Sequence, residues 1–232
     1  MNRYFLYLLV FMLLMVNSAS SQSAEEIIQQ VRAKLEKVND YEAKGKMKTN
    51  VTFIKIPVAT VTVYFKRPDK LRIKNEKGMS FVPKGSVNLN LGSILTTGGN
   101  YDFIDMGREK GSDFRIIKLL PRDENAEIVL STLYIDEKQM VIRKAKTTTR
   151  ENGTYELELT YGKYAEYSLA DKVIFSFNTK DYKLPKGITF DYDDGSGDKT
   201  PDKLKNRKGK VEITYSSYTI NKGVPDAVFS SP

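Results

Sequence analysis

The chain has 232 residues, of which 40% are apolar and 11% aromatic, so it can form one domain with a substantial hydrophobic core, or at most two small domains; we expect one. It contains no cysteine, histidine or tryptophan, which excludes disulfides, a lipid-modified cysteine, histidine- or cysteine-based catalysis, and zinc sites with nitrogen or sulfur ligands. The net charge of +8 suits an anionic membrane surface or nucleic acid. Because the basic residues are scattered rather than clustered among stacking aromatics, we expect a solvated basic surface and no nucleic-acid partner.

Residues 1–21 are typical of a cleaved signal peptide. Arg3 supplies the positive start, and Tyr4–Val16 form an apolar run of 13 residues that is followed by small residues. The run is short for a membrane span, and an uncleaved N-terminal anchor is the alternative. Cleavage near Ser21 leaves one exported domain, residues 22–232, with 36 basic and 29 acidic residues and a net charge of +7.

The mature chain is expected to begin with an amphipathic helix. Ser23 and Glu26 have the spacing of a capping box, in which each side chain satisfies the other residue's backbone amide. Apolar residues then recur at helical spacing at Ile27, Ile28, Val31, Leu35 and Val38. Such a helix must bury its apolar stripe against the rest of the domain.

From Asn39 onward the pattern is that of β-strands. Within 58–75, Val61, Val63 and Phe65 alternate with polar residues, and a turn at 67–70 leads to a second alternating run, which predicts an antiparallel hairpin. Further strands are expected at 41–53, 79–82, 101–106, 114–120, 128–135, 140–149, 155–161 and 187–192. A loop with a short helix is expected at 85–97, and a polar loop at 193–210. The short turns between strands indicate an antiparallel meander.

Two segments near the C-terminus resemble each other. Residues 159–176 and 213–230 share the pattern Thr-Tyr-x-x-Tyr, followed by an Asp-containing apolar run. Two copies are too few for a solenoid. We interpret them as two similar strand-turn-strand units, with coincidence as the alternative.

Carboxylates are the remaining source of acid, base or metal chemistry. Residues 191–198 are rich in Asp and Gly but lack the spacing and the late Glu of a calcium loop. Residues 195–200 imitate a phosphate loop, but Asp198 replaces the required glycine. Asp102 and Asp105 are three positions apart on a strand, which places them on opposite faces. The sequence therefore predicts no catalytic site, metal site or cofactor.

Strands 114–120 and 128–135 are apolar on both faces, and a sheet of this kind needs cover on both sides. Either the sheet curls into a well-filled core, or it leaves an apolar concavity that binds hydrophobic ligands. The residues expected to line such a concavity are Val61, Val63, Phe65, Leu71, Ile73, Phe114 and Ile116.

Several segments together resemble the bacterial outer-membrane lipoprotein carrier (LolA-like) family. The helix runs into Val38-Asn39-Asp40-Tyr41, a strand ends at Tyr64-Phe65-Lys66-Arg67-Pro68, and the next strand starts at Leu71-Arg72-Ile73. Segments 114–121, 133–136 and 224–229 also have counterparts in that family. The segment after Val82 lacks the family's Asp-Gly turn, and residues 162–210 form an additional strand-rich region.

The resemblance implies a mostly β, α+β fold: an incomplete, half-open antiparallel β-barrel with an N-terminal helix and short lid helices over its concave face. It also implies a monomeric, non-enzymatic periplasmic carrier that binds lipoprotein acyl chains. Such a carrier receives lipoproteins from an inner-membrane exporter and passes them to an outer-membrane acceptor. Arg67 matches the family arginine that bonds to the helical lid and helps control cargo release; an exposed turn residue is the alternative.

Two other functions stay open at this point. A periplasmic sensor or interaction module would use the same fold and concavity to detect a lipid or a protein. A hydrolase that uses carboxylates is the third possibility, although no paired site is visible.

Overall fold

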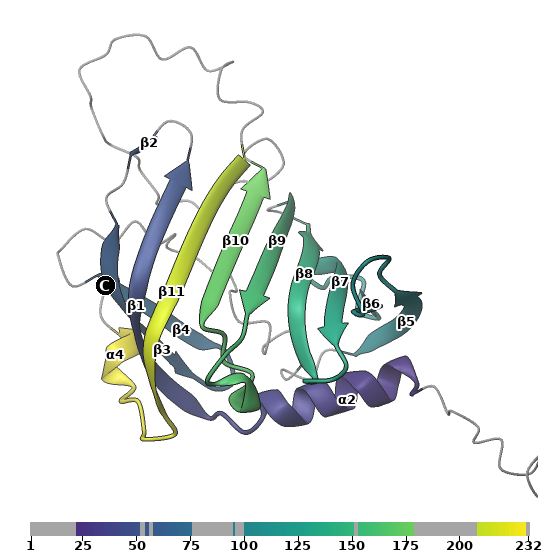
Figure 1. Ribbon diagram of the computed structural model, residues 1–232, viewed down its shortest axis with the longest axis horizontal. Helices are drawn as coiled ribbons and strands as arrows, with labels where there is room; N and C mark the ends of the chain where they lie inside the picture. Colours follow the sequence, from purple (N-terminus) through teal and green to yellow (C-terminus); the bar gives the residue numbers. More distant parts are fainter. Residues whose placement is uncertain are drawn as a thin grey trace, which may run out of the picture.

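The computed structural model describes residues 22–51, 54–55, 58–75, 95, 100–150, 153–178 and 208–230. Its main element is an antiparallel sheet of eleven strands (Figure 1). The strands are β1 (Asp40–Val51), β2 (Ile54–Lys55), β3 (Ala59–Lys66), β4 (Lys70–Asn75), β5 (Tyr101–Arg108), β6 (Arg115–Pro121), β7 (Ile128–Asp136), β8 (Val141–Thr149), β9 (Gly153–Thr160), β10 (Lys172–Asn178) and β11 (Lys208–Ile220). The helical elements are α2 (Ala24–Leu35), the short 3₁₀ helix η1 (Ala165–Tyr167) and α4 (Ala227–Ser230).

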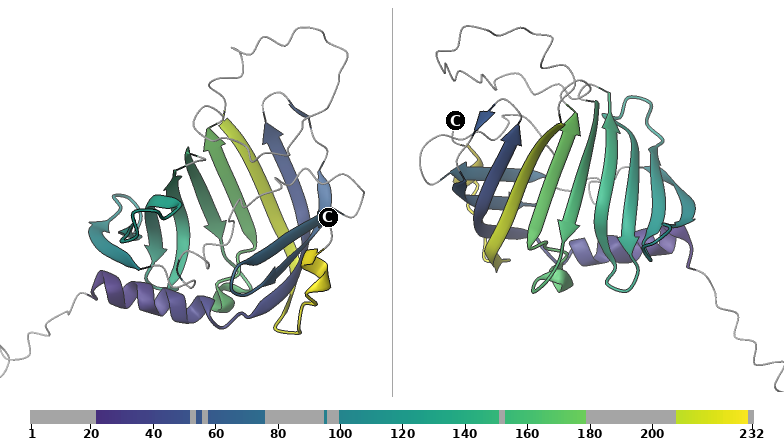
Figure 2. Two further views of the ribbon diagram at one scale, coloured as in Figure 1. Left: turned by 180° about the vertical axis from the view of Figure 1, so that it is seen from behind. Right: turned by 45° about the horizontal axis from the view of Figure 1, so that its top comes forward.

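The sheet curves strongly but does not close. Its order is β4-β3-β1-β11-β10-β9-β8-β7-β6-β5, with β2 paired to β1 off this path, so β4 and β5 are the two edges among the described strands. The pairing of β1 with β11 joins the two ends of the chain and makes the sheet continuous. Figure 2 shows the curvature from two further directions. The prediction of an incomplete, mostly β barrel with an N-terminal helix is confirmed.

Several predicted segments lie outside the described residues: the signal peptide at 1–21, the strands at 79–82 and 187–192, most of the 85–97 loop, and the acidic loop at 191–198. Within the 85–97 segment, Leu95 is described; it is helical and buried in the core beside α2. The predicted polar loop at 193–210 is wrong at its end, because β11 begins at Lys208 and pairs with β10 from there.

The second copy of the C-terminal repeat also differs from its prediction. The first copy is strand-turn-strand, since β9 leads through η1 into β10. In the second copy, β11 is followed by the short helix α4 instead of a strand. The carboxylate of Asp226, directly before α4, accepts hydrogen bonds from Lys66 Nζ and Lys70 Nζ, each at 2.8 Å, which hold this segment against the β3–β4 hairpin.

Helix α2 begins as predicted. The Ser23 hydroxyl accepts from the Glu26 N–H at 3.2 Å, and the Glu26 carboxylate accepts from the Ser23 N–H at 3.0 Å. The helix lies along one end of the sheet, below β8 to β5 in Figure 1. Its apolar stripe is buried in the main core together with residues of β6, β7, β8, β9 and β10.

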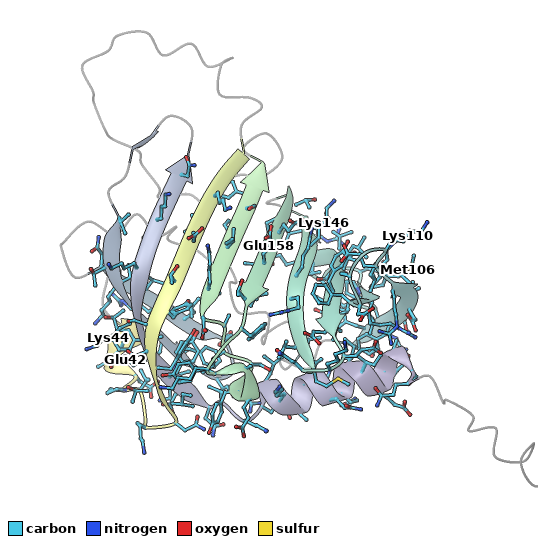
Figure 3. The ribbon with its side chains drawn as sticks, in the orientation of Figure 1. Glu42, Lys44, Met106, Lys110, Lys146 and Glu158 are labelled. Atoms are coloured by element: carbon cyan, nitrogen blue, oxygen red, sulfur yellow. The ribbon has the colours of Figure 1, made fainter. Side chains whose placement is uncertain are left out.

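The two faces of the sheet differ sharply along β1, β3 and β8 to β11. Apolar residues alternate onto the concave face, as in the register Ala43↔Val63 between β1 and β3. The convex face carries charged side chains, including Lys44, Lys146 and Glu158 (Figure 3). Cross-strand ion pairs on this face include Lys144–Glu156 at 3.1 Å and Lys172–Glu212 at 2.9 Å. The concave face is therefore the apolar one.

A bulge in β1 depends on a glycine. The register between β1 and β11 shifts between Lys44 and Gly45. A Cβ atom at Gly45 would lie 2.6 Å from the Thr214 carbonyl oxygen, which is closer than real Cβ contacts allow. Glycine at this position lets the two backbones approach, and the resulting bend adds to the curvature of the sheet.

Candidate functional site

A cavity of about 90 Å³ opens on the concave side, between the C-terminal part of α2, the β3–β4 hairpin and the centre of the sheet. This volume is several times the ~10–15 Å³ that one water molecule needs. Most of the wall is aliphatic or aromatic, and Arg67 is the one charged residue in it. The lining residues are Val31, Leu35, Val38, Tyr41, Val63, Phe65, Arg67, Leu71, Ile73, Ile142, Leu159, Tyr161, Tyr167, Ser168, Leu169, Ala170, Val173, Tyr215 and Tyr218.

The predicted hairpin residues lie at or beside this cavity. Val63, Phe65, Leu71 and Ile73 all line it. Val61 is on the same face of β3, fully buried in the adjoining apolar cluster, but it is not part of the cavity wall. The alternation within the hairpin therefore gave the correct inward face.

The other two predicted residues lie elsewhere, because the inward face of β6 is the opposite one. Ile117 and Leu119 are completely buried in the core against α2. Ile116 alternates with them on the other face of β6 and is half-buried. Phe114 precedes the strand, and the Arg143 guanidinium lies 5.8 Å from the centre of its ring. Neither Phe114 nor Ile116 lines the cavity.

The outward face of this part of the sheet is partly apolar. Ile104, Met106, Leu120 and Val129, on β5, β6 and β7, are 42%, 50%, 36% and 45% exposed. The expectation that both apolar faces would be covered is thus not met by the described residues. The sequence pattern could not tell the buried face of β6 from the exposed one.

Arg67 joins the hairpin to the end of helix α2. Its Nη1 donates to the Glu36 carbonyl oxygen at 3.2 Å, and its Nη2 lies 3.7 Å from Glu36 Oε1. Its backbone N–H donates to the Asn39 carbonyl oxygen at 2.8 Å. Glu36 is the C-cap of α2, where backbone carbonyls lack helical partners and carry partial negative charge. The guanidinium thus fastens the helix at the rim of the cavity.

Six tyrosines gather around the cavity, and Tyr218 lies at their centre. The ring centres of Tyr41, Tyr164 and Tyr215 lie 5.4, 4.9 and 5.1 Å from that of Tyr218. Tyr161 and Tyr167 contribute to the wall from the end of β9 and from η1. Rings at these separations pack favourably and give the cavity a rigid aromatic side.

The tyrosine hydroxyls fall into two groups. The Tyr218 hydroxyl donates to the Ala170 carbonyl oxygen at 2.6 Å, and the Tyr161 hydroxyl donates to the Ile142 carbonyl oxygen at 3.0 Å. No hydrogen bond joins the hydroxyls of Tyr41 and Tyr215 to another described residue. Burial raises the pKa of both tyrosines, so their hydroxyls stay protonated and neutral.

Sequence reasoning missed this tyrosine cluster, although a signal for it was present. Tyr161 and Tyr164 come from the first copy of Thr-Tyr-x-x-Tyr, and Tyr215 and Tyr218 come from the second. The two copies meet because β10 pairs with both β9 and β11. The repeat therefore marks one wall of the cavity.

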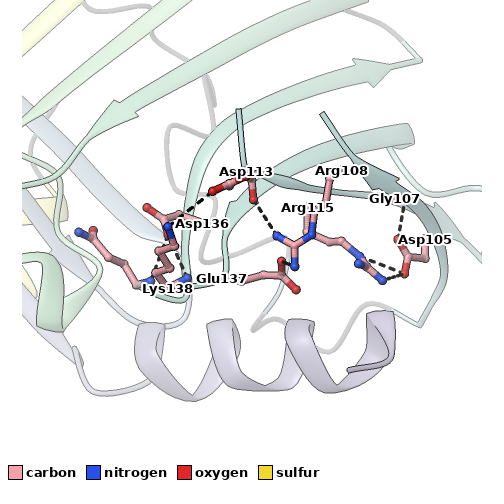
Figure 4. A network of polar contacts seen from close by, with 9 residues as sticks. Asp105, Gly107, Arg108, Asp113, Arg115, Asp136, Glu137 and Lys138 are labelled. Carbon is pink, nitrogen blue, oxygen red and sulfur yellow. Dashed lines mark hydrogen bonds and ion pairs between the residues drawn. The ribbon is translucent and has the colours of Figure 1, made fainter. Parts of the chain in front are cut away.

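A second polar site lies beside α2 at the β5–β6 end (Figure 4). Arg115 Nε donates to Asp105 Oδ2 at 3.1 Å, and the Gly107 N–H donates to Asp105 Oδ1 at 2.8 Å. Burial opposes ionisation of Asp105, but these hydrogen bonds prevail and lower its pKa. Arg108 pairs with Glu137. Because these carboxylates already have cationic partners, we interpret the network as structural and not as a general acid and base.

The described residues contain no cluster of three or more Asp and Glu side chains that could hold a metal ion. None of the helices in the described part of the chain is long and apolar enough to cross a membrane.

Comparison with known proteins identifies the fold. No protein-family model matches the chain, and no curated protein matches it. A LolA superfamily protein from Nitrosomonas europaea superposes with a TM-score of 0.55 at 12% identity, over 91% of this chain and 99% of its own. An outer membrane lipoprotein-sorting protein domain from Vibrio parahaemolyticus gives a TM-score of 0.53 at 13% identity, over 90% of this chain and 97% of its own.

The fold is LolA-like. A DUF1329 family protein from Desulfovibrio piger shares it too, with a TM-score of 0.51 at 11% identity, over 90% of this chain and 98% of that one. At such low identity the LolA-like likeness concerns the fold, and the predicted resemblance is confirmed at that level. The cavity lies on the concave face of the LolA-like sheet, where α2 covers one end.

Proposed function

We propose that this chain is a non-enzymatic carrier of acylated cargo, most specifically of lipoprotein acyl chains. The observation that carries the proposal is the cavity itself, because its wall is apolar on the hairpin side and aromatic on the β11 side. Burial of acyl methylenes there would provide about 0.8 kcal/mol each. The lipoprotein-sorting domain from Vibrio parahaemolyticus, which has the same fold, supports this choice of cargo.

The proposed cellular route follows from the same function. Residues 1–21 would direct export, and the mature chain would act in the periplasm as a monomer. It would receive cargo from an inner-membrane exporter and deliver it to an outer-membrane acceptor. Release would begin with separation of Arg67 from Glu36, since this contact holds the end of α2 at the rim of the cavity.

Native mass spectrometry tests the proposal on protein purified gently from its own periplasm, with bound material then extracted and identified. We expect co-purifying acyl lipids or lipoproteins. A cavity-filling variant, Val173→Phe, should lose this material, because Val173 lines the cavity from β10. The matched control is Thr60→Lys, because Thr60 is exposed and faces away from the cavity.

Two outcomes would contradict the carrier function. Protein that is free of lipid and holds a stable soluble protein partner would point to the sensor or interaction module. Equal lipid retention by the wild type and Val173→Phe would place the lipid outside the cavity. Circular dichroism of each variant distinguishes loss of binding from loss of folding.

A further inference from the structure

The cavity wall contains a buried hydroxyl that an acyl chain alone would not use. The Oγ atom of Ser168 is buried and has no hydrogen-bond partner in the described part of the chain. Ser168 lines the cavity, as do Tyr41 and Tyr215, whose hydroxyls also lack a described partner. A buried hydroxyl without a partner is costly, so native proteins seldom retain one without a reason.

The backbone holds Ser168 in an uncommon conformation. It follows η1 with φ of 52°, in the left-handed region where glycine is the residue most easily accommodated. The segment that follows Ser168 is hydrogen-bonded to β11 at two points. The Tyr218 hydroxyl donates to the Ala170 carbonyl oxygen at 2.6 Å, and the Tyr215 N–H donates to the Asp171 carbonyl oxygen at 2.8 Å. A strained residue held this firmly is typical of a functional site.

We infer that the cavity recognises the ester carbonyl of its acyl ligand as well as the hydrocarbon chain. The ligand class is a neutral acyl ester, whose carbonyl oxygen accepts hydrogen bonds from Ser168 Oγ and from the Tyr215 hydroxyl. This inference rests on the proposed function and adds the chemical group that is recognised.

The charges at the site favour an ester over a free fatty acid. A buried carboxylate needs a paired cation. Arg67 is the one cation in the cavity wall, and its guanidinium is already engaged with the Glu36 carbonyl and carboxylate. Protonated tyrosine and serine hydroxyls, in contrast, suit a neutral carbonyl oxygen.

The test is displacement of a fluorescent acyl probe from the purified protein by three ligands of equal chain length: monopalmitoylglycerol, its hexadecyl ether counterpart, and palmitic acid. The ether keeps the chain and the glycerol but lacks the carbonyl. We expect the ester to bind tighter than the ether by about three- to tenfold, the effect of one or two neutral hydrogen bonds. Palmitic acid should bind more weakly than the ester.

Two conservative variants assign the effect to the hydroxyls. Ser168→Ala and Tyr215→Phe should each reduce the preference for the ester over the ether toward one, with ether affinity unchanged within about twofold. The control is Ser216→Ala, because Ser216 is exposed and its hydroxyl bonds to the Lys44 carbonyl oxygen. Its ester preference should match that of the wild type.

The outcomes separate this inference from the proposed function. Equal binding of ester and ether by the wild type overturns the ester recognition and leaves the carrier function standing. The same holds if the preference survives in both Ser168→Ala and Tyr215→Phe, or if palmitic acid binds tightest. Failure of all three ligands to displace the probe overturns both.

Discussion

The guanidinium of Arg67 donates to the main-chain carbonyl of Glu36 at 3.2 Å, which ties the turn of the β3–β4 hairpin to the residue that ends helix α2. Both residues lie at the rim of the apolar cavity, although they are far apart in sequence. Movement of α2 away from the hairpin must break this contact. In the proposed carrier function, this contact is where we expect the cavity to open.

Replacement of Arg67 tests this role. Arg67→Leu removes the hydrogen bond and the ion pair to Glu36, and we expect a loss of about 1 kcal/mol in the free energy of unfolding, because the pair is partly exposed. Hydrogen exchange should accelerate at 36–39. An acyl probe should dissociate faster, because release no longer requires this contact to break. The control is Lys48→Ala on the exposed face of β1. Unchanged exchange at 36–39 would show that Arg67 does not hold the helix.

The capping box predicts the stability of α2. Ser23→Ala removes the acceptor for the Glu26 N–H, so the free energy of unfolding should fall by about 1 kcal/mol in urea denaturation. Gln22→Ala, one position earlier, should have little effect, since its side chain has no part in the cap. Equal stability of the Ser23 and Gln22 variants would contradict this account.

The two faces of β6 predict stability losses of different size for two adjacent isoleucines. Ile117→Ala should cost about 2–5 kcal/mol in the free energy of unfolding, because Ile117 is completely buried against α2 and its truncation leaves a cavity. Ile116→Ala should cost less than about 1 kcal/mol, because this residue lies half-buried on the other face. Urea denaturation of both variants measures the difference. A larger loss of stability for Ile116→Ala would contradict the assignment of Ile117 to the buried face of β6.

The contact between α4 and the hairpin should weaken at low pH. Hydrogen bonds from Lys66 and Lys70 lower the pKa of Asp226 from its ordinary value of 3.8 to about 2. Since the native pKa is the lower one, the stabilisation is complete above about pH 4 and is lost as the pH falls toward 2. An NMR titration of the Asp226 carboxyl should therefore have its midpoint near 2, and Asp226→Asn should remove the pH dependence of α4. A midpoint near 3.8 would mean that neither lysine binds it.

Sequence patterns predicted those parts of the fold that depend on residues close together in the sequence. The hairpin of β3 and β4 alternates strictly, so the inward positions of Val63 and Phe65 followed from the period of a strand. The capping box at Ser23 and Glu26 likewise depends on neighbours in sequence. In both cases the information lies within a few residues.

Prediction failed where the pattern did not show which residues of a strand face inward, and where segments that are distant in sequence meet. Ile116 and Ile117 are both isoleucine, so alternation could not assign the inward face of β6. The tyrosine side of the cavity exists because β1 pairs with β11, which brings Tyr41 to Tyr218 across most of the chain. The helix α4 lies where the repeat predicted a strand, and the residue before it, Asp226, pairs with lysines of a hairpin that is distant in sequence. Such tertiary contacts override local patterns.

The most direct test of the account is photolabelling with a fatty-acyl ester that carries a diazirine on its chain, followed by peptide mapping. If acyl chains occupy the concave cavity, the label should appear on residues such as Val63, Leu71 and Leu159, and Val173→Phe should abolish it. Labelling instead on the exposed apolar residues Ile104 and Leu120, unaffected by Val173→Phe, would contradict the account.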